Sequence, residues 1–188
     1  MRRLVYFVAA SVDGKIAGPD GTTAFLERDG GHWEAQVAEF PETVPTHLRQ
    51  LLEIDGPPRR FDTVLMGRRT HEVALDAGLT SGYQHLDQHV FTHDDALAHD
   101  ATVTLQDRHP RAVLEQLRTR PGQDIWLCGG GELAGQLSAQ LDELIVKVHP
   151  VVVGDGIGLF AGAPAPVELR LTTTRCFDSG VTVLRYER

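Results

Sequence analysis

Residues 125–133 read Ile-Trp-Leu-Cys-Gly-Gly-Gly-Glu-Leu, an apolar strand that runs into three glycines and then into a helical pattern. Because glycine has no Cβ, the backbone of Gly129, Gly130 and Gly131 can approach a bulky anion closely, where the helix start offers free N–H groups. The alternative is that these glycines only let the strand pack tightly against the helix. The run is a weak dinucleotide fingerprint, because Ala134 stands at the last glycine position.

A second strand leads into a glycine at residues 64–72, which read Val-Leu-Met-Gly-Arg-Arg-Thr-His-Glu. Gly67 permits a sharp turn, and Arg68 and Arg69 carry fork-shaped donors that match a phosphate group. The Thr70 hydroxyl can either cap the following helix or bind a phosphate oxygen. A capped helix with two solvated arginines is the competing interpretation.

The third such junction lies at residues 10–18, Ala-Ser-Val-Asp-Gly-Lys-Ile-Ala-Gly, directly after an apolar segment. Asp13-Gly14 is a favourable turn dipeptide, so a plain turn explains this segment as well as a site does. Open α/β sheets bind ligands at the carboxyl ends of their strands. In a site of that kind, Asp13 and Lys15 would lie at the mouth of the sheet.

Strands and helices alternate early in the chain, and strands dominate its last third. This order predicts an α/β fold with a mixed, mostly parallel sheet of about eight strands and a C-terminal antiparallel hairpin. Residues 11–31, rich in Gly, Asp and Thr, are expected to form a long loop. The expected strands are 3–10, 62–67, 88–92, 101–105, 124–128, 143–153, 167–175 and 181–187, and the expected helices are 32–40, 46–54, 70–77, 109–119 and 132–141.

The composition is that of an ordinary globular protein, and the 188 residues are expected to form one domain, 1–188. With 26 acidic and 18 basic residues the net charge is -8, which disfavours nucleic acid as a partner. No apolar run approaches the roughly 20 residues that cross a bilayer. The amino terminus also lacks the features of a secretory signal, so no membrane association and a cytoplasmic location are expected.

The residues that could bind a metal do not form a known pattern. The two cysteines, Cys128 and Cys176, fit neither a zinc motif nor a disulfide framework. His71-Glu72 would need a second histidine at position 75 to resemble a zinc protease helix, and that position is Leu75. No metal site is therefore expected.

Taken in order, these segments resemble the dihydrofolate-reductase superfamily and, within it, the reductase domain of bacterial riboflavin biosynthesis and its stand-alone relatives. Residues 9–17 look like the first strand and loop of those reductases, and residues 64–72 are similar to their Gly-Arg-x-Thr-x-Glu signature. Residues 125–133 resemble the strand-plus-glycine phosphate segment, and residues 142–160 look like the riboflavin-reductase tail. The resemblance spans nearly the whole chain and implies a three-layer, dihydrofolate-reductase-like fold.

The resemblance also implies NADPH, rather than NADH, bound across the carboxyl ends of the strands. A cis peptide bond between Gly129 and Gly130, and a symmetric homodimer, are expected on the same ground. By resemblance, Ala10, Ala17 and Gly18 border the nicotinamide, Gly67, Arg68, Arg69 and Thr70 hold the phosphates, Thr92 and His93 lie near the ribose 2′-phosphate, and Gly129, Gly130, Gly131, Glu132 and Leu133 pack along the pyrophosphate.

Catalytic residues are less well marked. Dihydrofolate reductases carry a buried acid on the helix before the Gly-Arg-x-Thr strand, and Glu34 is the candidate there, beside the weaker candidates Asp13 and Lys15. The riboflavin reductases carry an acid just before their phosphate glycines, where this chain has Cys128.

Three functions are compatible with these features. The first is an NADPH-dependent reductase, related to 5-amino-6-(5-phosphoribosylamino)uracil reductase, that transfers hydride to a C=N or C=C–C=O group of a small heterocycle. The second, favoured by the missing acids, is an NADP-binding sensor or scaffold with little catalysis. The third is a phosphate-binding transferase on an ordinary doubly wound sheet, which requires that the C-terminal strands do not join the main sheet.

Overall fold

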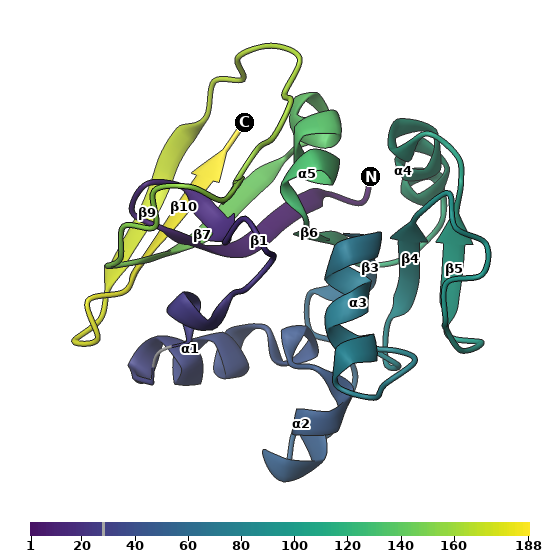
Figure 1. Ribbon diagram of the computed structural model, residues 1–188, viewed down its shortest axis with the longest axis horizontal. Helices are drawn as coiled ribbons and strands as arrows, with labels where there is room; N and C mark the ends of the chain where they lie inside the picture. The colour runs from purple at the N-terminus through teal and green to yellow at the C-terminus, as the bar shows by residue number, and fades with distance from the viewer. Residues whose placement is uncertain (28) are drawn as a thin grey trace.

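The computed structural model of the chain describes residues 1–27 and 29–188. Within these residues the main sheet has eight strands, and a small second sheet pairs two more (Figure 1). The main-sheet strands are β1 (Leu4–Ser11), β3 (Phe61–Gly67), β4 (Asp87–Phe91), β5 (Val103–Gln106), β6 (Asp124–Gly129), β7 (Glu143–His149), β9 (Arg170–Cys176) and β10 (Thr182–Glu187), and the second sheet holds β2 (Lys15–Ala17) and β8 (Ile157–Gly158). The helices are α1 (Gly31–Glu39), α2 (Thr46–Leu51), α3 (Arg68–Asp76), α4 (Pro110–Thr119) and α5 (Gly131–Leu137), with short 3-10 helices at Ala24–Leu26, Pro41–Thr43 and Ser138–Gln140.

The main sheet is mixed, in the order β5-β4-β3-β6-β1-β7-β10-β9. The strands from β5 to β7 in this order run parallel, and β10 is antiparallel to both β7 and β9. The predicted mostly parallel sheet with an antiparallel end is therefore confirmed. Because the C-terminal strands join the main sheet, the transferase hypothesis loses the condition on which it depended.

Helices cover both faces of the sheet, as the three-layer prediction requires. Leu114 of α4 and Leu133 of α5 are buried with Tyr6 on one face. Phe40, which follows α1, and Leu75 of α3 pack in the core of the other face. In Figure 1, α4 and α5 lie at the top of the view and α1 lies at the bottom. Side chains alternate across a strand, so each buried strand supplies both cores.

The long loop predicted at residues 11–31 is wrong in part, because this segment contains β2 and a 3-10 helix. Lys15 pairs with Gly158, and Ala17 pairs with Ile157. A Cβ at Gly156 would lie 2.4 Å from the Ala17 carbonyl oxygen, so the glycine allows the close approach. Local sequence gives no sign of this pairing, since the partner of β2 lies near the other end of the chain.

Several element boundaries differ from the predicted ones. Helix α3 begins at Arg68 rather than Thr70, because the chain turns at the extended residue Gly67. Helices α2 and α5 end early, at Leu51 and Leu137. Strand β7 ends at His149, directly before Pro150, which has no N–H to donate to a ladder.

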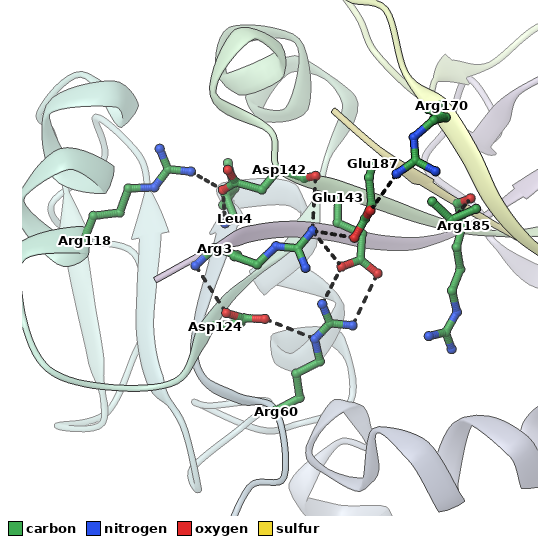
Figure 2. Close-up of polar contacts among 11 residues, drawn as sticks. Arg3, Leu4, Arg60, Arg118, Asp124, Asp142, Glu143, Arg170, Arg185 and Glu187 are labelled. Carbon is green, nitrogen blue, oxygen red and sulfur yellow. Dashed lines mark hydrogen bonds and ion pairs between the residues drawn. The ribbon is translucent and has the colours of Figure 1, made fainter. Parts of the chain in front are cut away.

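The amino-terminal ends of the parallel strands are held by an ion cluster of Arg3, Arg60, Asp124 and Glu143 (Figure 2). The buried Glu143 carboxylate lies 2.5 Å from an Arg60 nitrogen and 3.4 Å from an Arg3 nitrogen. Asp124 binds Arg60 at 3.2 Å. Charged side chains thus fasten this end of the sheet, and the residues singled out by the sequence lie at the opposite, carboxyl end.

Candidate active site

The two glycine turns predicted from sequence meet at the carboxyl end of the sheet, because β3 and β6 are neighbours. A Cβ built on Gly67 would lie 3.8 Å from the Gly130 nitrogen. The Thr70 Oγ1 atom lies 3.9 Å and 3.8 Å from Cβ positions built on Gly129 and Gly130. The predicted cis peptide bond between Gly129 and Gly130 is confirmed.

The glycines differ in what they accommodate. A Cβ at Gly131 would lie 2.1 Å from the Gly158 carbonyl oxygen, so packing against β8 explains this glycine. Gly67 and Gly130 have negative φ, and their Cβ atoms would meet nothing closer than 3.8 Å. Within the described chain, neither the contacts of a Cβ atom nor φ requires glycine at 67 or 130.

The start of α3 carries the predicted basic residues. Arg68 and Arg69 are exposed, and Arg68 binds Glu72 one turn later at 2.5 Å. Thr70 lies inside the first turn of α3, so its hydroxyl does not cap the helix, contrary to one of the two interpretations. The first N–H groups of a helix lack intrahelical partners, and its positive dipole end favours an anion.

At the start of α5, Glu132 is exposed and Leu133 is buried in the core. Leu133 can therefore offer a ligand its backbone but not its side chain. Thr92 and His93 directly follow β4, two strands along from β6. The Thr92 hydroxyl accepts the Asp94 N–H at 3.0 Å, and His93 is exposed.

Ala10, near the end of β1, is buried, and so are Ala17 and Gly18 at the end of β2. Asp13 has a structural role here, since its carboxylate accepts the Ser11 hydroxyl at 2.7 Å and the Gly154 N–H at 2.7 Å. These hydrogen bonds, led by that of Ser11, lower the pKa of Asp13 to about 2. An acid that stays ionised at neutral pH is unsuited to donating a proton.

Neither of the other two catalytic candidates lines a cavity of the described chain. The Lys15 Nζ lies 3.5 Å from the Gly156 carbonyl oxygen, in the small second sheet. Glu34 is exposed on α1 and does not line the cavity beneath that helix.

That cavity, which we call the α1 cavity, has a volume of about 240 Å³ and lies between α1 and the face formed by β1, β7, β10 and β9. Its residues were not predicted as functional. It is lined by Phe7, His32, Ala35, Gln36, Glu39, Phe40, Ile145, Lys147, Thr173, Arg175, Phe177, Val183 and Arg185. One signal was present in the sequence: Lys147 is the single charged residue within the apolar run 144–148, and it is one of only two lysines in the chain.

Cys128, at the position of the riboflavin-reductase acid, is not a substitute for that acid. Burial raises the pKa of Cys128 to about 12, against a smaller opposing effect of the Tyr83 hydrogen bond. The thiol is therefore neutral at pH 7 and inert as a nucleophile. Cys128 interacts electrostatically with Lys147, whose own pKa burial lowers to about 8.

Two absences hold for residues 1–27 and 29–188 of the chain. In that part of the chain no three His, Cys, Asp or Glu side chains gather as a metal-binding group. Over the same residues, no helix has the length and apolar character needed to cross a membrane.

Comparison with known proteins gives consistent matches over the full chain. The family model for the RibD C-terminal domain matches residues 2–183. The uncharacterized protein YwjB of Bacillus subtilis strain 168 is 32% identical over 189 residues, which cover 100% of this chain and 98% of that protein.

Two solved structures share the fold at low sequence identity. A Shewanella sp. PV-4 protein provisionally assigned to riboflavin biosynthesis has a TM-score of 0.72 at 20% identity, covering 100% of this chain and 99% of the other. A diaminohydroxyphosphoribosylaminopyrimidine deaminase/5-amino-6-(5-phosphoribosylamino)uracil reductase of Thermotoga maritima has a TM-score of 0.65 at 14% identity, covering 99% of this chain and 56% of the other.

Proposed function

Because this chain belongs to the RibD C-terminal domain family, we propose that it is an NADPH-dependent reductase that transfers hydride to a small heterocyclic or imine-type substrate. The observation that carries the proposal is the room beside Gly67 and Gly130. Both glycines stand where two strand ends meet, and a Cβ atom at either would contact no atom of the described chain, outside its immediate neighbours in sequence, closer than 3.8 Å. A ligand backed against the two strand ends explains why neither position carries a side chain.

The residues around this room fit a dinucleotide. Arg68 and Arg69 supply cationic forks for phosphate oxygens, and the Thr70 hydroxyl lies on the side facing Gly129 and Gly130. The N–H groups at the starts of α3 and α5 add donors for the pyrophosphate. In a chain with a net charge of -8, these local groups are what can hold a polyanion.

The two ends of the cofactor would lie on neighbouring parts of the same edge. Thr92 and His93, after β4, would contact the ribose 2′-phosphate, which distinguishes NADPH from NADH. Ala10, Ala17 and Gly18 would border the nicotinamide, which supplies the hydride when the cofactor is bound. The chain itself binds and orients both reactants and keeps water away from them.

The substrate class is proposed from the family and from the relatives. The Thermotoga maritima protein is named as a reductase of a ribosylated aminouracil, which is a small heterocycle. At 14% identity the shared fold does not transfer that substrate to this chain.

A second function, an NADP-binding sensor or scaffold with little catalysis, is favoured by a specific observation. None of the acids sought as proton donors is available as one: Glu34 is exposed outside the α1 cavity, Asp13 is used within its turn, and Cys128 replaces the riboflavin-reductase acid. A sensor would bind NADPH and leave it unoxidised with every substrate offered.

The site is tested by a Gly67→Ala substitution and an NADPH titration followed by nucleotide fluorescence. The added methyl would touch protein atoms only at ordinary distances, so the melting temperature should stay unchanged. It would fill space meant for the cofactor, so NADPH should bind at least tenfold more weakly. Gly82→Ala is the matched control, since its Cβ would lie 3.7 Å from the Ala74 Cβ, again an ordinary contact.

Unchanged NADPH affinity in Gly67→Ala would refute the proposed site. The choice between reductase and sensor needs a second measurement on the wild-type protein: NADPH absorbance followed across a panel of pterins and pyrimidinones. Oxidation with at least one substrate class supports the reductase, whereas tight binding without any oxidation supports the sensor.

A further inference from the structure

The α1 cavity concentrates positive charge in an acidic protein. Three cationic side chains line it, Lys147, Arg175 and Arg185, against one carboxylate, Glu39. Glu39 is already bound, because its Oε2 atom lies 2.5 Å from an Arg185 nitrogen. Figure 2 shows that the Arg185 side chain makes none of the contacts of the neighbouring ion cluster. The cavity therefore keeps an excess of positive charge from Lys147 and Arg175.

Lys147 lies within this cavity without a carboxylate partner among residues 1–27 and 29–188. Its Nζ donates to the Gln36 Oε1 at 2.5 Å and lies 5.2 Å from the centre of the Phe7 ring. These contacts leave the ammonium of this partly buried side chain without an anionic partner in the described chain. A bound anion would supply that partner, since a buried charge is costly unless it is paired.

The walls of the cavity suit a flat ring. Phe7, Phe40 and Phe177 present aromatic surface, and the Arg175 guanidinium lies 4.6 Å from the centre of the Phe177 ring. The volume of about 240 Å³ admits a heterocycle of one or two rings. Aromatic walls fix the plane of such a ring, and a charged group then fixes its orientation within that plane.

Lys147 brings the cavity towards the carboxyl end of the sheet. Lys147 stands opposite Ala9 in the pairing of β7 with β1, one residue before Ala10. Lys147 also interacts electrostatically with Cys128, which directly precedes Gly129 and Gly130. A ring held above Lys147 would therefore lie close to the end of the sheet where the nicotinamide is proposed.

We propose that the α1 cavity is the substrate site and that it takes a flat heterocycle carrying an anionic group, a carboxylate or an acidic ring oxygen, which the Lys147 ammonium binds. This inference rests on the proposed reductase function and names its substrate class. It reverses the expectation placed on Glu34: an acid would bind a cationic or hydrogen-bond-donating ring, whereas Lys147 selects the opposite charge.

The test uses two probes of the same shape, pyrazine-2-carboxylate and pyrazine-2-carboxamide, which differ in charge. Binding is measured at pH 7 by NMR titration of the full chain. The carboxylate should bind the wild type at least tenfold more tightly than the amide. Lys147→Met, which keeps the side-chain length, should weaken carboxylate binding at least tenfold and leave amide binding unchanged. Lys147→Arg, which keeps the charge, should restore much of the preference.

Arg111→Met removes an exposed arginine on α4, on the other face of the sheet, and should change neither affinity. Equal affinity of the wild type for the two probes, or full carboxylate binding by Lys147→Met, would overturn the proposal. NADPH is titrated into the same proteins. If the wild type does not bind NADPH, the proposed function is refuted. If it binds NADPH but binds the carboxylate and the amide with equal affinity, this inference alone is refuted.

Discussion

At the scale of single residues, glycine has two different roles at the carboxyl ends of β3 and β6: one glycine allows close packing, and two others leave a strand end without a side chain. Gly131 is required by packing, because any side chain there would run into the Gly158 carbonyl group. Gly67 and Gly130 meet no such obstacle and leave room at the strand ends. The sequence is compatible with both explanations for each glycine, tight packing or the approach of a ligand. It does not distinguish them, because the difference depends on which distant segment lies against each glycine.

Lys147 shows a second limit of sequence reasoning. A lysine inside an apolar strand can be noticed in the sequence. Its place in a cavity, however, depends on Gln36, Phe7 and Arg175, which lie on three other elements. Local motifs indicate other catalytic candidates instead, namely Asp13, Lys15 and Glu34. The structure gives Asp13 a role within its turn and leaves Glu34 on the surface.

Burial of Lys147 should make the stability of the wild type depend on pH. Its pKa falls from the ordinary 10.5 to about 8, so between these values the unfolded chain binds the proton and the folded chain does not. Stability then rises with pH across this window. Below pH 8 both states are charged and the penalty of burying the ammonium is fully present. The advantage in unfolding free energy of Lys147→Met over the wild type should therefore be largest near pH 7 and shrink towards pH 10.

Urea denaturation at pH 7 and pH 10 measures this effect. The charged and titratable groups that share the cavity with Lys147 are His32, Glu39, Arg175 and Arg185, with Cys128 beside it, and all of them remain in the variant. The arginine of Lys147→Arg stays protonated at both pH values. The difference in unfolding free energy between Lys147→Arg and Lys147→Met should therefore be the same at pH 7 and pH 10. A difference in unfolding free energy between Lys147→Met and the wild type that is the same at pH 7 and pH 10 would contradict the destabilised ammonium.

At the scale of secondary-structure elements, the apolar runs and glycine turns predicted most strands and helices, because a buried strand shows its character locally. Strand β2 could not be found in this way, since three residues become a strand only through pairing with β8. The ion cluster at the amino-terminal end of the sheet is similar: Arg3, Arg60 and Glu143 are far apart in sequence and meet through the strand order alone.

Two acids at this end of the sheet, Glu143 in the ion cluster and Glu187 beside it, should contribute unequally to the free energy of unfolding. Glu143→Ala would leave Arg60 without its closest partner in a mostly buried place, and breaking such a pair costs about 3 kcal/mol. Glu187→Ala removes a half-exposed partner of Arg3 and Arg170 and should cost less than about 1 kcal/mol. Chemical denaturation compares the two variants, and equal losses would show that burial does not set the strength of these pairs.

At the scale of the whole molecule, the sheet ends in an uncovered strand. Every residue of β9 is exposed, and the Leu171 side chain on it is half-exposed to water. An open strand edge with apolar side chains is a site where another chain can pair. We propose a symmetric homodimer that covers this edge, as the family resemblance also implies. Light scattering at micromolar concentration should give twice the monomer mass, and a monomer mass would count directly against the dimer.

Binding of NADPH at the carboxyl ends of β3 and β6 is tested most directly by parallel titrations with NADPH and NADH. The cations of Arg68 and Arg69, with His93 at the end of β4, lie in an otherwise acidic protein where the additional 2′-phosphate can reach them. NADPH should bind at least tenfold more tightly than NADH, which is about 1.4 kcal/mol, and Arg68→Ala should narrow that difference. Equal affinities for the two nucleotides, or binding of neither, would contradict the account.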